Sequence, residues 1–303
     1  MSRRYAILDV FTDRRLAGNP LAVVLDAEGL DERAMQAIAA EFNLSETVFV
    51  FPADQPGLTA KVRIFTPARE LPFAGHPTVG TAIYLAKPRC ELMGGDCKAV
   101  IVLGEGVGPV RCGVRLAADG SVGSAEFDLP KKPRFIRGGG PAEAIAAALD
   151  LDPRDIGCEN HVPTVFEAGV PYAFVPVRDL DAVRRARPVP QLWGAAFAED
   201  APSAFVYCRE TVRHDAAFHA RMFAPEFGIT EDPATGSAAA AFAGVIHRFD
   251  ALPDGRHATP VEQGVEMGRP SFIRLEIEIQ RGQIQTARIG GQAVVVAEGT
   301  LHI

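Results

Sequence analysis

Hydrophobic and polar residues follow two different periods along this chain, and the combination predicts a mixed α/β fold. Within residues 31–42, Met35, Ile38 and Phe42 recur three and four positions apart, so they share one face of a helix. The run at 47–51 is instead rich in β-branched and aromatic residues, which favour strands. Helices and strands are therefore expected to alternate from the start of the chain.

The remaining elements are predicted from the same signals and from the glycines and prolines that separate them. Helices are expected at 76–86, 141–150 and 235–247. Strands, some of them broken by glycine, are expected at 5–11, 21–25, 61–65, 99–129, 162–166, 172–175, 204–207, 218–223, 272–279, 283–289 and 293–297.

Short segments of the two halves of the chain resemble each other in the same order. The pairs are Gly18–Ala22 with Gly169–Ala173, Arg63–Pro67 with Arg221–Pro225, and His76–Ala82 with Asp232–Ala238. Chance similarity of short motifs is the alternative, but the shared order favours a duplicated unit. We therefore predict two domains, residues 1–120 and 121–289, with residues 290–303 returning to the first.

Composition limits what the protein can bind. The net charge of −7 gives no general support for nucleic-acid binding. No apolar run is long enough to cross a bilayer. The cysteines are odd in number and form no CxxC pair; they are Cys90, Cys97, Cys112, Cys158 and Cys208. We therefore expect reduced cysteines in a cytoplasmic protein, with no disulfide framework and no metal site.

Each copy of the repeat has a strand, a Phe-x-Pro loop and a helix opened by His76-Pro77 or Asp232-Pro233. A helix start presents unpaired backbone N–H groups and a partial positive charge, and it suits a carboxylate or phosphate. Two such starts facing one cleft between the domains would hold a small acid. The alternative is that His76 and Asp232 only cap their helices, since Asp is a preferred N-cap residue.

Glu46 lies at the start of a mostly apolar strand. A buried carboxylate there would lose hydration, which raises its pKa toward the range useful for proton transfer. The alternative is an exposed glutamate that is hydrogen-bonded to a turn.

Several motifs, in order, resemble the phenazine-biosynthesis PhzF-like isomerase family. They span nearly the whole chain and are Asp9-Val10-Phe11-Thr12 with Gly18–Val23, Asn43-Leu44-Ser45-Glu46-Thr47, Phe65-Thr66-Pro67 with Glu70–Thr78, Glu231–Ala238, and Gln263-Gly264 with Gly268–Ser271. The resemblance implies a diaminopimelate epimerase-like fold of two pseudo-symmetric α/β domains, each wrapping a mixed sheet around a central helix. It also implies a cofactor-free homodimer that acts on a small cyclic carboxylic acid.

The resemblance carries site roles to matching positions. It implies that Glu46 is the catalytic acid/base and that His76 and Asp232 lie beside the substrate. It places substrate binding at a further set of positions, which is Asn19, Gly75, Gly236 and Ser237.

The same resemblance implies a mechanism with a single carboxyl group. Diaminopimelate epimerase uses a cysteine at each helix start, where this chain has His76 and Asp232. The leading hypothesis is therefore an isomerase that moves a proton without a cofactor. Two alternatives stay open: a two-base epimerase of amino or hydroxy acids, and a catalytically idle protein that binds a small acid. Neither a membrane nor a nucleic acid is an expected partner.

Overall fold

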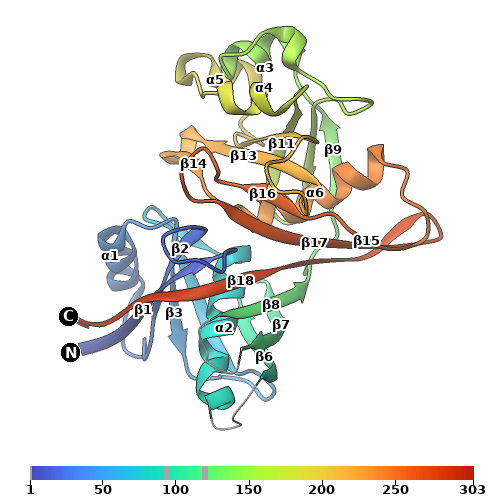
Figure 1. The fold of residues 1–303 in the computed structure, drawn as a ribbon. Coiled ribbons are helices and arrows are strands. Elements are labelled where there is room, and N and C mark those ends of the chain that lie inside the picture. The colour runs from blue at the N-terminus through green and yellow to red at the C-terminus, as the bar shows by residue number, and fades with distance from the viewer. Residues whose placement is uncertain (1, 92–95, 118–121) are drawn as a thin grey trace. The chain divides into compact units, whose positions relative to one another are not determined.

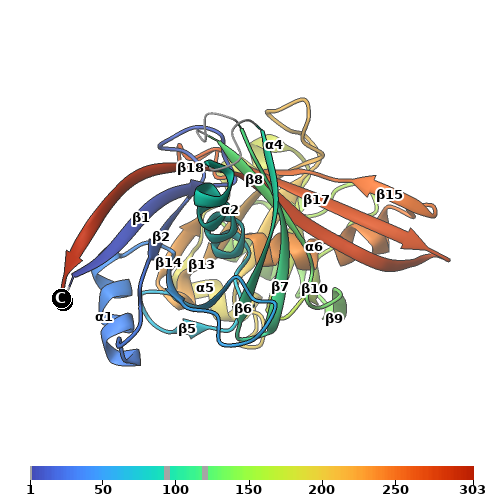
Figure 2. The same ribbon diagram turned by 90° about the horizontal axis from the view of Figure 1, so that it is seen from below.

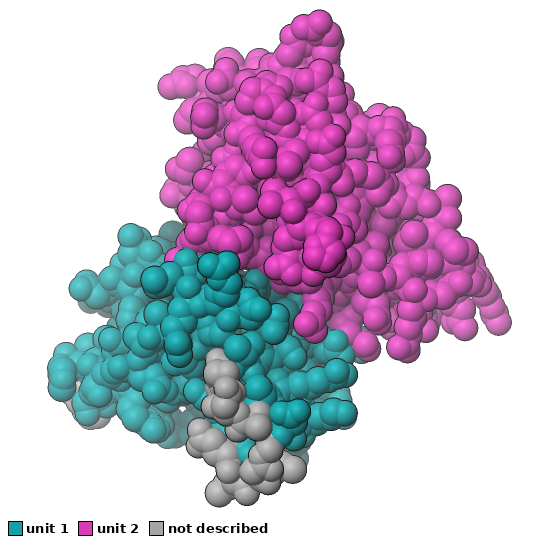
Figure 3. Space-filling model, in the orientation of Figure 1, with its two compact units in different colours: residues 1–130, 290–303 teal, residues 131–289 magenta. Residues whose placement is uncertain are grey.

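The computed structural model describes residues 2–91, 96–117 and 122–303, and the chain divides into two compact units (Figure 3). Unit 1 is Met1–Pro130 with Gly290–Ile303, and unit 2 is Lys131–Ile289. The boundary predicted after residue 120 falls at 118–121, outside the described residues. The units divide later because β8 (Gly123–Asp128) pairs with strands of unit 1, namely β7 and β18.

Unit 1 is a ring of strands around a helix (Figures 1 and 2). Besides β8 its strands are β1 (Ser2–Val10), β2 (Asn19–Val24), β3 (Glu46–Phe51), β4 (Ala60–Phe65), the short β5 (Glu70–Leu71), β6 (Cys97–Glu105), β7 (Gly108–Leu116) and the end of β18 (Gln283–His302). Pairing runs β18–β1–β2–β3–β4–β6–β7–β8 and returns to β18.

The central helix of unit 1 is α2 (Gly75–Glu91), which packs against β1, β2, β3, β6, β7 and β8. Its fit is tight at Gly80, where an added Cβ would lie 2.6 Å from Leu21 Cδ2 and 2.8 Å from Val10 Cγ2. The other helix, α1 (Glu32–Phe42), covers β3 and β4 from outside. It buries Met35 and Ile38 against Phe49, as the spacing of its apolar residues predicts.

Unit 2 wraps a second sheet around α6 (Gly236–Phe249). Its strands are β9 (Arg134–Gly138), β10 (Thr164–Glu167), β11 (Pro171–Pro176), β12 (Ala204–Cys208), β13 (Phe218–Ala224), β14 (Ile229–Asp232), β15 (Gly255–Ala258), β16 (Val261–Gln263), β17 (Ser271–Gln280) and the start of β18. The outer helices are α3 (Ala142–Ala148), α4 (Leu180–Arg185) and α5 (Pro190–Ala196), with 3-10 turns at Pro153–Asp155 and Pro225–Phe227.

The two units repeat the same order of strand pairing. In unit 1 the pairs β1–β2, β2–β3, β3–β4 and β4–β6 are antiparallel, parallel, antiparallel and parallel. In unit 2 the pairs β10–β11, β11–β12, β12–β13 and β13–β16 follow the same sequence of directions. Each unit therefore has the predicted architecture, a mixed sheet wrapped around a central helix.

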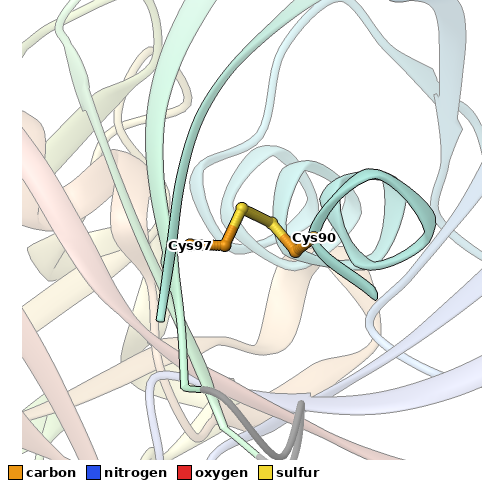
Figure 4. Close-up of a disulfide and its surroundings, with 2 residues drawn as sticks. All are labelled: Cys90 and Cys97. Atoms are coloured by element: carbon orange, nitrogen blue, oxygen red, sulfur yellow. A yellow bond between two sulfur atoms is a disulfide. The ribbon is translucent and has the colours of Figure 1, made fainter. Parts of the chain in front are cut away.

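The expectation that all five cysteines are reduced is wrong for two of them. Cys90 of α2 and Cys97 of β6 form a disulfide, with their Cα atoms 5.4 Å apart (Figure 4). The two cysteines come together because α2 and β6 pack against each other. The other cysteines, Cys112, Cys158 and Cys208, are free and buried.

None of the helices in the described part of the chain is long and apolar enough to span a membrane.

Candidate active site

Glu46 is placed by the turn that ends α1. Asn43 follows the helix in the left-handed conformation, with φ 50°, and its N–H bonds to Ala39 O. Asn tolerates this conformation better than most residues, so it suits the position. Three residues after Asn43 the chain enters β3 at Glu46, beside Leu21 of β2.

The register of β3 directs the Glu46 side chain toward α2. Paired residues of neighbouring strands point to the same face of a sheet, and Leu21 contacts α2 at Gly80. Alternation then sends Thr47 and Phe49 to the other face, where Phe49 packs against α1. Glu46 is thus on the inner face of the ring, on the side of the helix.

His76 meets Glu46 from the first turn of α2. Its Nε2 lies 3.4 Å from Glu46 Oε2, and the two side chains are 4% and 16% exposed. The same face also carries Asn19, which is fully buried and pairs with Val10. Gly75 begins α2 next to His76. Four predicted site residues, Glu46, His76, Asn19 and Gly75, therefore belong to one unit, and two of them are in direct proximity.

Burial controls the charge of His76. Desolvation lowers the pKa of its imidazole to about 3, so the ring is neutral near pH 7. A nearby Glu46 carboxylate favours the imidazolium form, but removal of the ring from water is the larger effect. A neutral imidazole beside a carboxyl group can donate one hydrogen bond to it.

Glu105, which is not part of any of the sequence motifs, contacts the start of α2. Thr78 Oγ1 lies 2.8 Å from Ala74 O and 2.7 Å from Glu105 Oε1. Burial raises the pKa of Glu105 to about 8. The contact links the β6–β7 turn to the segment that carries His76.

Asp232 ends β14 in unit 2 and is 6% exposed. Its Oδ2 accepts the hydroxyl of Thr235 at 2.6 Å. Gln263 donates to Asp232 O at 2.8 Å and to Thr235 Oγ1 at 3.1 Å, and its Oε1 accepts the Thr235 N–H at 3.2 Å. A closed set of hydrogen bonds therefore fixes the residues that precede α6. Sequence reasoning identified the Gln263-Gly264 motif but not this role.

Ser237 lies in the first turn of α6, after Gly236. Its Oγ is 2.7 Å from the hydroxyl of Tyr172 on β11, and Tyr172 is 6% exposed. Tyr172 belongs to one of the repeated segments, but its hydroxyl had no counterpart at the matching Leu21, so the sequence offered no signal for the contact.

The predicted equivalence of His76 with Asp232 needs correction. Both helices begin at a glycine, and Gly75-His76 corresponds to Gly236-Ser237. In each copy the helix glycine follows the pattern Glu-x-Pro-x-x-Gly, which starts at Glu70 or Glu231. Asp232 therefore does not open or cap a helix; the N-cap residue of α6 is Thr235.

Each unit carries its own polar cluster. Unit 1 has the Glu46 carboxyl group beside a neutral imidazole, and groups of this kind can transfer a proton. Unit 2 has the Asp232 carboxyl group and the paired hydroxyls of Ser237 and Tyr172. No group of three or more His, Cys, Asp or Glu residues among those described is arranged to hold a metal ion.

Known proteins resemble this chain over nearly its whole length. A family model described as phenazine biosynthesis-like protein, PhzC-PhzF, matches residues 8–299. An uncharacterized isomerase of Mesorhizobium japonicum is 55% identical over 306 residues, covering 100% of this chain and 99% of the relative. The trans-2,3-dihydro-3-hydroxyanthranilate isomerase of Pseudomonas aeruginosa is 34% identical over 303 residues, covering 99% of each chain.

A solved structure also matches the fold of this chain. The crystal structure of a phenazine biosynthesis protein of the PhzF family from Bacillus anthracis matches with a TM-score of 0.87 and 27% identity, covering 100% of both chains.

Proposed function

This chain belongs to the phenazine biosynthesis-like PhzC-PhzF family, and on that premise we propose that it is a cofactor-free isomerase of a small carboxylic acid. Glu46 moves the proton. Its carboxylate takes a proton from one carbon of the substrate, and the resulting carboxylic acid returns a proton to another carbon of the same molecule. The double bond shifts, no electron leaves the substrate, and Glu46 regains its charge.

The single observation that carries this proposal is the proximity of Glu46 to His76. A carboxylate that abstracts a proton from carbon needs a partly desolvated site, and Glu46 is 16% exposed. His76 is neutral, so it does not hold Glu46 in a salt bridge that would weaken the base. As a neutral donor, His76 can hydrogen-bond to charge that develops on the substrate.

We further propose that the starts of the two long helices, and the polar side chains near them, bind substrate. Gly75 and Gly236 begin the two long helices, whose N-terminal N–H groups suit a carboxylate. Ser237 adds a hydroxyl that is oriented by Tyr172. Asp232 is held by Thr235, and it accepts a hydrogen bond from a substrate amine or hydroxyl group.

The Pseudomonas aeruginosa relative suggests the first compound to assay, because its name specifies trans-2,3-dihydro-3-hydroxyanthranilate. The test incubates the purified protein in D2O with this compound and with a panel of small cyclic and acyclic carboxylic acids. Migration of a double bond with deuterium at the new C–H position supports the isomerase. Deuterium at an inverted stereocentre without migration would indicate an epimerase instead. Binding without any turnover across the panel would contradict catalysis.

A further inference from the structure

Arg63 on β4 is clamped to the segment that leads into α2. Its Nε donates to Glu70 Oε1 at 2.7 Å and its second terminal nitrogen to Glu70 Oε2 at 2.5 Å, which is a bidentate pair. The guanidinium also donates to Glu32 of α1 at 3.0 Å and lies over the ring of Phe65, 5.2 Å from its centroid. One side chain thus joins β4, β5 and the outer helix.

Arg221 on β13 repeats this arrangement in unit 2. It donates to Glu231 at 2.9 and 2.8 Å and lies over Phe223, 4.8 Å from the ring centroid. Its remaining nitrogen donates to carbonyls at the end of α4, including Ala186 O at 2.7 Å. Here the outer contact is with unpaired carbonyls at a helix C-terminus, groups that a cation satisfies.

The two copies share a sequence pattern that extends the similarity of Arg63–Pro67 with Arg221–Pro225. Each reads Arg-x-Phe-x-Pro, then a loop, then Glu-x-Pro-x-x-Gly. The loop is two residues long after Pro67 and five residues long after Pro225. The ion pair persists although the loop length differs, which indicates that the pair, and not the loop, sets the position of the glycine.

Strand alternation connects each ion pair to the site. In β14, Glu231 and Asp232 point to opposite faces, because they are neighbours along a strand. Arg221 holds Glu231 on the outer face, so Asp232 is turned inward. In unit 1 the pair fixes Glu70, and a short connection of four residues leads from Leu71 to His76.

We propose that Arg63–Glu70 and Arg221–Glu231 are duplicated positioning pairs, each of which holds the site residue of its own unit, His76 or Asp232, in place for the reaction. The proposal rests on the proposed isomerase function. Neither pair touches the substrate. Each acts by preventing small displacements of a reacting or binding group, displacements that can lower a rate by up to about 100-fold.

The test uses Glu70→Gln and Glu231→Gln, which keep the side-chain shape and one hydrogen bond to the arginine. Each is combined with His76→Asn and with Asp232→Asn, and kcat and KM are measured for all eight proteins and the wild type. Glu70→Gln should lower kcat/KM about 10-fold in the wild type and in Asp232→Asn, but less than 2-fold in His76→Asn. Glu231→Gln should show the reverse dependence, with its effect lost only in Asp232→Asn.

A general structural role predicts something different. If each Glu→Gln change lowers kcat/KM by the same factor in all three backgrounds, the positioning proposal is overturned. The two pairs differ in exposure, so one of them controls for misfolding of the other. The side chains of Arg63 and Glu70 are 27% and 36% exposed, whereas those of Arg221 and Glu231 are 7% and 13% exposed. The exposed pair tolerates substitution even if Glu231→Gln folds poorly.

Amide hydrogen exchange separates failure of this proposal from failure of the isomerase. Exchange should accelerate at 74–78 only in Glu70→Gln and at 232–236 only in Glu231→Gln. If the wild type turns over no substrate but exchange follows this pattern, the isomerase function fails and the local positioning stands. Acceleration spread evenly over the chain contradicts the positioning role regardless of activity.

Discussion

Thr78 Oγ1 lies within hydrogen-bond distance of both Ala74 O and Glu105 Oε1, at 2.8 and 2.7 Å, although a hydroxyl has one proton to donate. A protonated Glu105 resolves the conflict, because it donates to Thr78 while Thr78 donates to Ala74 O. Burial raises the pKa of Glu105 from 4.5 to about 8, which keeps the carboxyl group neutral near pH 7.

The raised pKa of Glu105 makes stability depend on pH. Between pH 4.5 and 8 the folded protein keeps a proton that the unfolded chain releases, so the free energy of unfolding falls as pH rises. Glu105→Gln removes this effect and can still donate to Thr78. Its stability relative to the wild type should rise by up to about 1.4 kcal/mol per pH unit across that range. Urea unfolding at pH 5, 6, 7 and 8 measures the difference, and a difference that does not change with pH would refute the assignment.

His76 should give the opposite dependence of stability on pH. Its pKa of about 3 lies below the unfolded value of 6.5, so the unfolded chain binds a proton that the folded chain does not. Stability linked to neutral His76 is complete above pH 6.5 and is lost as pH falls toward 3. The wild type should lose stability relative to His76→Asn over this range. Because Glu105 and His76 oppose each other between pH 4.5 and 6.5, each variant is compared with the wild type at the same pH.

Tyr172→Phe removes the hydroxyl that lies 2.7 Å from Ser237 Oγ and keeps the ring. We expect kcat/KM to fall about 3- to 10-fold, mainly through KM, because Ser237 loses its orientation for binding. Tyr84→Phe is the matched control. Its hydroxyl donates to Glu298 at 2.9 Å, away from the site residues, and its loss should leave kcat/KM unchanged. Equal effects of the two changes would argue against a role for Tyr172 in the site.

The Cys90–Cys97 disulfide can be counted directly. Protein purified without reductant and unfolded in guanidinium should show three reactive thiols, from Cys112, Cys158 and Cys208, and five after reduction. Closing so short a loop should stabilise the fold by about 2–3 kcal/mol, so Cys90→Ser should lower the free energy of unfolding by that amount. Five thiols without reduction would show that the bond is absent from the protein in solution.

Local patterns in the sequence predicted most of the fold. The apolar spacing of α1, the small residues of α6 and the repeated Phe-x-Pro segments each reflect contacts within one element or one turn. The Cys90–Cys97 disulfide was not predicted because it depends on the packing of β6 against α2, which is a tertiary contact. The equivalence of His76 with Asp232 was wrong because it was based on the two Xaa-Pro pairs. The Glu-x-Pro-x-x-Gly pattern gives the correct alignment, in which the two helix glycines match.

The site was only partly predictable for a related reason. From the residues alone, Glu46 could have been an exposed glutamate at the start of a strand, and the family motif decided in favour of the site. The register of β3 against β2 explains its direction, but register is a tertiary property. Thr235, Glu105 and Tyr172 were not identified, because each joins segments that are distant in the sequence.

The central claim is that Glu46 carries the proton. The most direct measurement compares wild type and Glu46→Gln in D2O with a substrate that the wild type turns over, following deuterium incorporation by mass spectrometry and substrate binding by calorimetry. We expect Glu46→Gln to lower incorporation and turnover together by about 100-fold or more, while the dissociation constant changes less than about 5-fold. Wild-type rates of incorporation in Glu46→Gln would contradict the account.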